Sequence, residues 1–272
     1  ILAVILARAG SKGVKGKNTK NLCGHPLISY SIYAALKSKK ISKLIVSTDS
    51  KKIKKISENY GAQVPFIRPK KLALDHIWSR DALKHCVIKA EKIYKEKYDY
   101  IVELPAVAPL RDYNDINNAI SKLIKSNADS VIGVSRVYDK HPIRIKKIIN
   151  NEIKDFNKLL KEGESSRRQE LNPAYVRNGS IYAMKRDTII KNFSRKGKKS
   201  FALKMDSIKS VNIDEITDFY LAETLIKKGY CKNFPASIYK KNYLITKNVK
   251  KEKNILVSYN YEISKNIFNN FK

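Results

Sequence analysis

The clearest indication of the fold class is Leu2-Ala-Val-Ile-Leu6, followed directly by Ala7-Arg-Ala-Gly-Ser-Lys-Gly13. Five consecutive apolar residues that run into glycines are typical of a buried strand that ends in a loop. Glycines allow the backbone to approach an anion, and the free N–H groups of such a loop can bind phosphate. Arg8, Lys12 and Lys17 add fixed positive charge. The sequence therefore predicts a strand over 2–6 and a phosphate-binding loop over 8–21.

Strand and helix patterns alternate after this loop. Pro26 is favourable at the start of a helix that reaches about residue 38, and Gly61 is a natural end for another. Further strands are predicted over 44–46, 64–67, 98–104, 131–135 and 181–184, and further helices over 51–60, 79–95, 112–126 and 215–228. This alternation predicts an α/β fold with a doubly wound, mostly parallel sheet and helices on both faces.

In such sheets, ligands bind at the carboxyl ends of the strands. We therefore expect one rim to be shared by four loops, at 8–21, 47–50, 68–80 and 104–111. Asp49 and Asp214 are expected just after strands on this rim, and carboxylate and phosphate oxygens are the ligands that Mg²⁺ prefers. Helix capping is the alternative role for each aspartate.

The length and composition indicate a globular protein. A chain of 272 residues, 43% of them hydrophobic, can bury a full single-domain core. No run approaches the roughly 18 to 20 apolar residues that a membrane span needs, and residues 1–6 are too few for the apolar part of a signal peptide. These features predict a cytoplasmic protein without a membrane partner.

The net charge of +31 raises the question of nucleic-acid binding. Lysine accounts for 45 of the 56 basic residues and arginine for only 11, and the lysines are spread over the whole chain. Proteins that read bases usually use arginine, and no helix-turn-helix, RNP or zinc-finger spacing is present. We therefore expect no nucleic-acid partner, although the positive field should attract anionic substrates.

Short motifs occur in one order along residues 1–229. They are Leu6-Ala-Arg8 with Ser11-Lys-Gly13 and Lys17-Asn18, Pro26-Leu27, Ile45-Val-Ser-Thr-Asp49, Arg68-Pro69, Leu72-Ala73 with Asp75 and Ser79, Pro109-Leu-Arg111, Arg168-Gln169, Asn178-Gly-Ser-Ile-Tyr182 and Ile213-Asp214. In these motifs the sequence resembles the CMP-sialic acid synthetases, or acylneuraminate cytidylyltransferases. The resemblance implies a fold of the nucleotide-diphospho-sugar transferase type.

The resemblance also implies roles for individual residues. It implies that the phosphates of CTP are bound by Arg8, Ser11 and Lys17, beside Lys12 of the same loop, and that the cytidine is framed by Asn18, Arg68 and Ser79. Asp214 would hold Mg²⁺ as cofactor, with Asn212 as its partner position, and Arg168 and Tyr182 would contact the sugar. The candidate catalytic residues are Arg8, Lys17 and Asp214.

The implied reaction transfers CMP from CTP to the anomeric hydroxyl of a nine-carbon sugar acid and releases pyrophosphate. Three departures from the family pattern leave a sialic, legionaminic or pseudaminic acceptor open. Asn212 stands where the family usually has a first aspartate, and 104–111 is one residue longer and lacks the glutamine that contacts the sugar. In Val176-Arg-Asn-Gly179 the arginine is shifted by one position from the family's Arg-Pro-Asn-Gly. The resemblance further implies a homodimer, with an excursion at 141–177 as the dimerisation element of a catalytic domain over 1–230. Residues 231–272 form a tail of unassigned role or the start of a further α/β unit.

Three other functions fit parts of the pattern. A nucleotidyltransferase for another sugar or nucleotide would share the glycine- and lysine-rich loop and the sheet. A non-catalytic nucleotide-binding relative would be consistent with Asn212. A nucleic-acid-binding protein would be consistent with the net charge.

Overall fold

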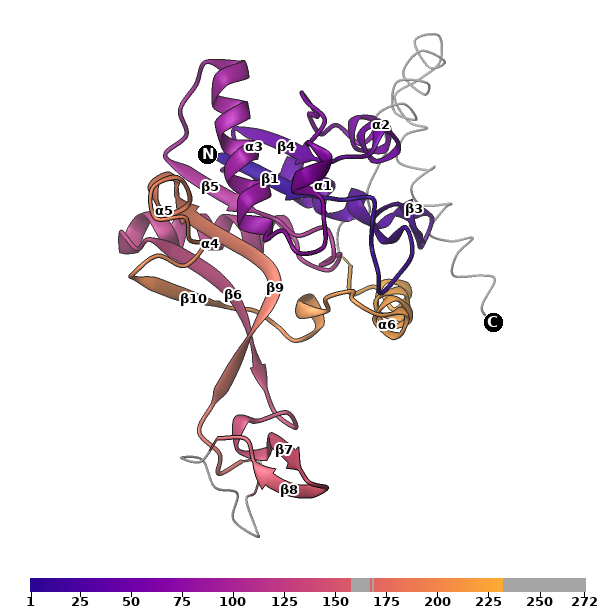
Figure 1. Ribbon diagram of the computed structural model, residues 1–272, viewed down its shortest axis with the longest axis vertical. Helices are drawn as coiled ribbons and strands as arrows, with labels where there is room; N and C mark the ends of the chain where they lie inside the picture. The colour runs from indigo at the N-terminus through magenta and orange to yellow at the C-terminus, as the bar shows by residue number, and fades with distance from the viewer. Residues whose placement is uncertain (158–166, 168, 232–272) are drawn as a thin grey trace, which may run out of the picture. The chain divides into compact units, whose positions relative to one another are not determined.

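The centre of the molecule is a six-stranded sheet in the order β10-β6-β9-β5-β1-β4 (Figure 1). The strand bounds are β1 Leu2–Leu6, β4 Lys43–Ser47, β5 Tyr100–Glu103, β6 Ser130–Val137, β9 Ala174–Lys185 and β10 Ser200–Lys204. β1 pairs in parallel with β4 and β5, and β6 pairs in parallel with β10. β9 lies between β5 and β6 and is antiparallel to both. This computed structural model describes residues 1–157, 167 and 169–231.

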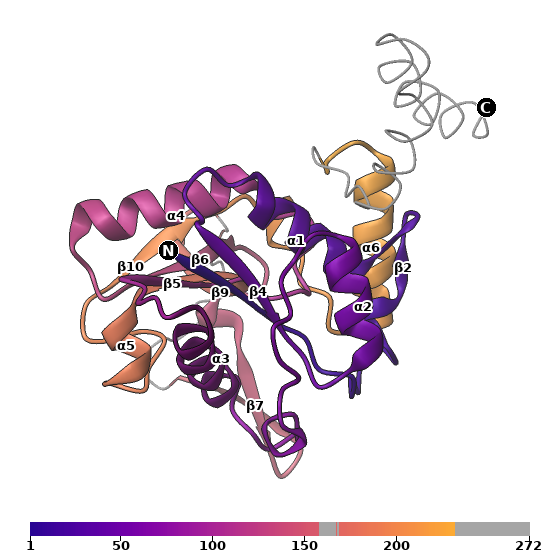
Figure 2. The same cartoon turned by 90° about the horizontal axis from the view of Figure 1, so that it is seen from above.

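Helices cover both faces of the sheet, as Figure 2 shows. One face packs against α1 (Leu27–Lys37) and α4 (Tyr113–Ser126), and the other packs against α3 (Ser79–Tyr94) and α5 (Arg186–Ile190). Neighbouring residues of each strand point to opposite faces. Val102 therefore joins the core under α1 and α4, whereas Ile101 joins the core under α3. The predicted doubly wound, mostly parallel sheet is confirmed.

The helix ends follow from local sequence. Pro26 precedes α1 with φ −58°, which suits a helix start. Ser50 caps α2 (Lys51–Asn59) by accepting a hydrogen bond from the backbone N–H of Ile53 at 3.3 Å. Gly61 follows α2 at φ +93°, a backbone conformation that favours glycine.

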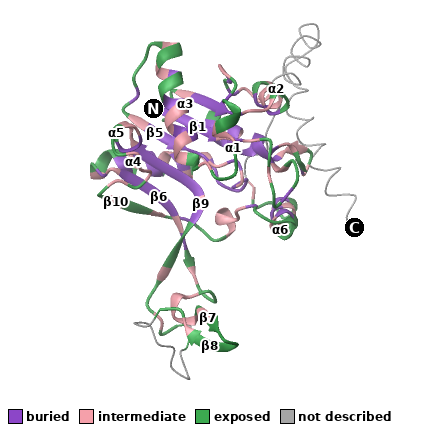
Figure 3. Ribbon diagram, viewed as in Figure 1, coloured by how far each residue is buried: buried purple, intermediate pink, exposed green. Residues whose placement is uncertain are grey.

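The fold also contains helix α6 (Ile216–Lys227) and several shorter elements. They are η1 Lys17–Thr19, β2 Asn21–Leu22, β3 His25–Pro26, η2 Lys70–Leu72, η3 Pro142–Arg144, β7 Lys146–Ile149, β8 Glu152–Asp155 and η4 Ile208–Ser210. β7 and β8 form an antiparallel hairpin beyond the paired ends of β6 and β9, and we call this hairpin the arm. The arm is mostly exposed or half-buried, in contrast to the buried central strands (Figure 3).

The structure differs from the strands expected from the sequence in three places. Residues 64–67 do not form a strand, because only Gln63 makes an isolated bridge to Ile45. The strand expected at 181–184 extends over Ala174–Lys185, since its first residues pair with β6 outside the main core. β10 was not expected, because its residues are mostly exposed and lack a continuous apolar pattern.

Some expectations fall outside the described residues. These include Arg168 and all of the tail except Cys231. None of the described helices is long and apolar enough to cross a membrane.

Candidate active site

The parallel strands β1, β4 and β5 end at one rim of the sheet. The loop after β1 is hydrogen-bonded to the loops that follow β4 and precede α3. The backbone N–H of Ala9 donates to Asp49 Oδ1 at 3.0 Å, and an Arg8 guanidinium N–H donates to the carbonyl of Ala73 at 3.3 Å. The predicted shared rim is therefore present.

Lys17 connects the phosphate-loop candidate to the segment before α6. Its Nζ donates to the carbonyl of Ile213 at 2.6 Å and lies 3.1 Å from Asp214 Oδ1. The Lys17 side chain is only 13% exposed, whereas that of Asp214 is 69% exposed. Asn18 is buried beside it and donates to the carbonyl of Arg8 at 3.0 Å. These contacts fix the Lys17 ammonium group and attach the loop after β1 to the segment before α6.

The segment that carries Asn212 and Asp214 differs from the expectation. It does not follow a strand, because η4 and a short loop precede it. Asp214 does not cap α6 either, since that role belongs to Glu215 and Asp218 in a reciprocal capping box. Instead, Asn212 Nδ2 donates to Asp214 Oδ2 at 2.9 Å, so the two candidate metal ligands are adjacent.

Gly13 lies where the phosphate loop touches this segment. A Cβ atom on Gly13 would lie 2.1 Å from the backbone oxygen of Asp214, whereas a Cβ on Gly10 would meet nothing within 4 Å. Gly13→Ala must therefore move the loop away from the residues that bind Lys17.

We predict that Gly13→Ala lowers kcat/KM for CTP by about tenfold or more, because displaced donors no longer face the developing charge. Gly10→Ala is the matched control in the same loop and should stay within about twofold of the wild type. Initial rates of pyrophosphate release at varied CTP measure both variants. Equal activity of the two variants would show that the contact between Gly13 and Asp214 is unimportant.

Arg8 and Lys12 share one counter-ion in this structure. Arg8 lies 2.7 Å and Lys12 2.8 Å from the carboxylate of Asp75. The hydrogen bond from Lys12 is the main reason why the pKa of Asp75 lies below its usual value. Ser11, the fourth residue of the predicted phosphate site, donates its N–H to the carbonyl of Ala9. An incoming phosphate would therefore compete with the exposed carboxylate of Asp75 for these cations.

Arg68 is one of the few buried charged residues, with 3% exposure. Its guanidinium lies 3.9 Å from Asp49, and burial lowers its pKa although Asp49 opposes that shift. Asp49 is not the N-cap of α2, because Ser50 occupies that position. Asp49 instead connects the buried arginine to the backbone of the phosphate loop.

Ser79 and Tyr182 are brought together by two residues that the sequence did not single out. Arg195 donates to both the hydroxyl of Ser79 and the carboxylate of Glu103, and its guanidinium lies 5.0 Å from the centre of the Tyr182 ring. Glu103 pairs with Tyr182 across β5 and β9. An acidic residue inside an apolar strand pattern was the available signal for Glu103.

Glu103 is a buried acid on the ligand rim. Burial raises its pKa to about 7, and the nearby Arg195 guanidinium limits that rise. Its Oε2 atom is buried and has no hydrogen-bond partner in the described part of the chain. The nucleotide candidate Ser79 and the sugar candidate Tyr182 are therefore both in contact with Arg195, whose counter-ion is the buried Glu103.

Asn212 and Asp214 carry oxygen atoms of the kind that Mg²⁺ prefers, although the Asn212 amide turns its Nδ2 toward Asp214 in this structure. Within residues 1–157, 167 and 169–231, no group of three or more His, Cys, Asp or Glu side chains is arranged to hold a metal. Asp214 offers an exposed carboxylate, and Asn212 Oδ1 is a buried oxygen without a described hydrogen-bond partner. Mg²⁺ commonly takes one or two protein oxygens and completes its shell with substrate phosphates and water.

Comparisons with known proteins agree with this geometry. The family described as Cytidylyltransferase matches residues 2–259. The chain is 37% identical over 235 residues to a CMP-N,N'-diacetyllegionaminic acid synthase of Legionella pneumophila, covering 84% of this chain and 96% of the relative. It is 35% identical over 230 residues to the post-translational flagellin modification protein B of Campylobacter coli, covering 84% of this chain and 95% of the relative.

A solved structure shows the same fold at low identity. It is a CMP:2-keto-3-deoxy-manno-octonic acid synthetase complexed with CTP, with a TM-score of 0.60 and 16% identity over 84% of this chain and 98% of that one. The arrangement of the sheet and of the glycine- and lysine-rich loop is consistent with the family match over residues 2–259. This chain belongs to the cytidylyltransferase family.

Proposed function

We propose that this protein transfers CMP from CTP to the anomeric hydroxyl of a nine-carbon sugar acid of the sialic, legionaminic or pseudaminic type. The main observation that supports the proposal is the contact between Lys17 and the segment of Asn212 and Asp214. This contact joins the predicted phosphate-binding loop to the side-chain oxygens of Asn212 and Asp214, at the edge of the sheet where ligands are expected to bind. The 37% identical relative named a CMP-N,N'-diacetyllegionaminic acid synthase makes a legionaminic acid the first acceptor to test.

The proposed reaction is a displacement at phosphorus. The anomeric hydroxyl of the sugar loses its proton to water as its oxygen forms a bond to the α-phosphorus of CTP. The bond from the α-phosphorus to the bridging oxygen of the β-phosphate breaks, so pyrophosphate leaves. Positioning and charge compensation supply most of the catalysis in such reactions. Lys17 and Arg8 would bind the negative charge that develops on the leaving group.

A magnesium ion is part of this proposal. Asp214 and Asn212 would hold it, each through a side-chain oxygen. When bound, Mg²⁺ would neutralise phosphate charge and help orient the α-phosphate. Lys17 would remain beside Asp214 and hold that carboxylate in one direction.

A pyrophosphate-release screen tests the proposed reaction. We expect release with CTP and N,N'-diacetyllegionaminic, N-acetylneuraminic or pseudaminic acid, and little release with an eight-carbon 3-deoxy-manno-octonic acid. CTP should also raise Tm more than ATP, GTP or UTP, because a ligand that binds only the folded state stabilises it. Equal stabilisation by GTP, or no release with any nine-carbon acid, would contradict the proposal.

We also propose that the protein is a homodimer that pairs through its arm. Two apolar side chains of the arm are largely exposed, namely Ile148 (73%) and Ile153 (74%), and so is Phe156 (65%), the residue that follows the arm. Large apolar side chains grouped on one projecting hairpin are typical of a contact surface. A second copy would bury them.

The solution mass tests the dimer. An Ile148→Lys/Ile153→Lys variant should shift the mass from dimer to monomer in sedimentation analysis. Ile93→Lys is the matched control, because Ile93 is also exposed (45%) but lies on α3. A monomeric wild type, or a double variant that remains dimeric, would contradict this surface.

The cytoplasm is the proposed location of the enzyme, because CTP is made and used there. Cell fractionation with an antibody against the protein tests this location. Recovery of the protein outside the cytoplasmic fraction would contradict it.

A further inference from the structure

The two candidate metal ligands lie on a segment with little regular structure. Between the end of β10 at Lys204 and the start of α6 at Ile216, only η4 is regular. A loop of this kind holds its side chains in place only if other residues fix it. The contacts that fix it therefore determine where Asn212 and Asp214 lie.

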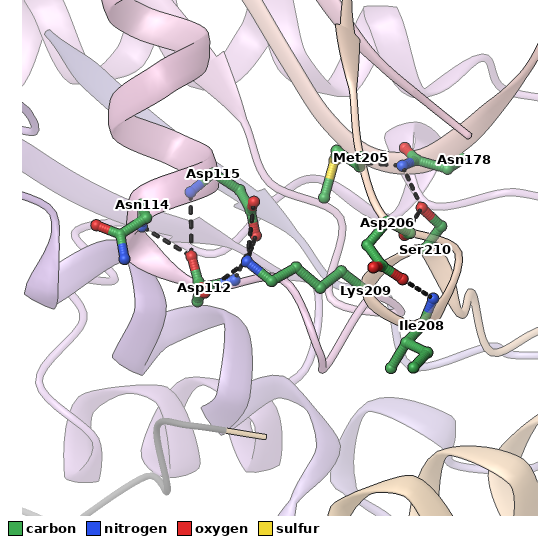
Figure 4. Close-up of polar contacts among 9 residues, drawn as sticks. All are labelled: Asp112, Asn114, Asp115, Asn178, Met205, Asp206, Ile208, Lys209 and Ser210. Atoms are coloured by element: carbon green, nitrogen blue, oxygen red, sulfur yellow. Dashed lines mark hydrogen bonds and ion pairs between the residues drawn. The ribbon is translucent and has the colours of Figure 1, made fainter. Parts of the chain in front are cut away.

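Lys209 provides the charged contact, as Figure 4 shows. Its Nζ lies 2.7 Å from Asp112 Oδ2 and 3.2 Å from each carboxylate oxygen of Asp115. The two aspartate side chains are only 9% and 13% exposed, and Lys209 is 28% exposed. Because this ion pair is mostly shielded from water, it constrains geometry more than a surface pair does.

The aspartates that bind Lys209 are themselves fixed. Asp112 accepts hydrogen bonds from the backbone N–H groups of Asn114 and Asp115, and the carboxylate of Asp115 accepts one from the N–H of Asp112. This capping box holds the first turn of α4. Just before it, the buried guanidinium of Arg111 donates to the carbonyls of Pro105 and Ser180. Lys209 is therefore attached to a rigid helix start.

Neutral contacts hold the other side of the segment. Asn178 Nδ2 donates to the hydroxyl of Ser210 at 2.9 Å, next to Lys209 in the chain (Figure 4). Gly179 has φ +64°, and a Cβ there would lie 3.2 Å from the Asn212 amide. The backbone N–H of Ile213 donates to Val107 at 2.9 Å. Lys209 thus provides an ionic contact near the start of the segment, and the ion pair of Lys17 with Asp214 provides another near its end.

We propose that Lys209 is a positioning residue for the nucleotide-bound metal, which it controls through its ion pairs with Asp112 and Asp115. This inference rests on the proposed function. The ion pairs attach the segment at Lys209 to the first turn of α4, three residues before Asn212 and five before Asp214, which faces Lys17. Removal of the Lys209 ammonium lets the segment shift without removing any metal ligand.

Metal binding measured without turnover is the main test. Binding of Mn²⁺ to the full chain with α,β-methylene-CTP, followed by the EPR signal of free Mn²⁺, should weaken about tenfold in Lys209→Met, the usual loss when an outer-shell partner is removed. Lys209→Arg keeps the charge and should recover most of the affinity. Lys54→Met is the matched control, because it removes a lysine that pairs with Glu58 within α2 and makes no described contact with the segment of Asn212 and Asp214.

A triple variant separates positioning from stability. Lys209→Met leaves two poorly exposed carboxylates without their cation and should lower Tm. Adding Asp112→Asn and Asp115→Asn removes that uncompensated charge, so Tm should recover while Mn²⁺ affinity remains about tenfold weak. Recovery of both Tm and affinity would show a purely structural role and overturn the proposal.

The outcomes also distinguish this inference from the proposed function. Unchanged Mn²⁺ affinity in Lys209→Met would overturn the positioning role even if the wild type uses a nine-carbon acid. Absence of turnover with every acid would overturn the proposed acceptor, whereas a Lys209-dependent Mn²⁺ affinity would still support the positioning role.

Discussion

Lys17→Ala should lower kcat by about 10²-fold or more at saturating substrates, the usual loss when a group that faces developing charge is removed. The Lys17 ammonium is 13% exposed and is fixed by Ile213 and Asp214, so little reorganisation is needed when the leaving group gains charge. Asp214 is largely exposed, and the loss of its cation should therefore change Tm little. Steady-state pyrophosphate release and a thermal melt measure the two effects.

Lys15→Ala is the matched control for Lys17. Lys15 lies in the same loop but is exposed, and no described ion pair involves it. Its kcat should stay within about twofold of the wild type, which would exclude a general effect of net charge. Unchanged kcat in Lys17→Ala would show that the loop is structural and that pyrophosphate departure is assisted elsewhere.

Much of the fold was predictable because its signals are local. Apolar runs predicted the parallel strands, and the helix starts near Pro26, Ser50 and Asp112 follow from backbone and capping chemistry within a few residues. The position of the glycine- and lysine-rich loop was also a local signal, because its glycines and cations follow β1 directly. Where the determinants are close in sequence, expectation and structure agree.

The parts that were not predictable depend on contacts between distant residues. Lys209 lies 97 and 94 positions from the aspartates that it binds, and Arg195 lies 92 positions from Glu103. Nothing in a lysine-rich surface pattern distinguishes Lys209 from its neighbours. The antiparallel direction of β9 was equally hidden, because a buried strand has the same apolar pattern in either direction.

The proposed metal site has the same mixture of local and distant determinants. Asp214 and Asn212 are two residues apart and their adjacency is local, but their placement beside Lys17 depends on the closed loop at Gly13. The expectation that Asp214 follows a strand was wrong, and η4 with its supports takes the place of a strand end. A site held by a loop is more sensitive to remote changes than one held by a strand.

Asp214→Ala should abolish detectable turnover, a loss of about 10³-fold, because it removes the carboxylate that would hold the metal opposite the phosphates. The fold should persist, since Asp214 is 69% exposed and does not cap α6. Asp187→Ala is the matched control, because it removes an exposed carboxylate that pairs with Lys191 away from the rim. Turnover as a function of Mg²⁺ concentration is the measurement for both variants.

Asn212→Asp adds a carboxylate at the proposed metal site, so we expect an effect on Mg²⁺ binding opposite to that of Asp214→Ala. A second carboxylate beside Asp214 should lower the Mg²⁺ concentration needed for half-maximal rate, since each carboxylate adds attraction for the cation. The variant also loses the 2.9 Å hydrogen bond from the Asn212 amide to Asp214, and in the absence of metal two like charges would meet there. Tm without Mg²⁺ should therefore fall and should recover as Mg²⁺ is added. If Asn212→Asp instead abolishes activity, the amide group itself is required, and the change in sugar KM against kcat would show whether it binds the acceptor. Full Mg²⁺-dependent activity in Asp214→Ala would place the metal elsewhere on the rim, with Asp49 as the next carboxylate to replace.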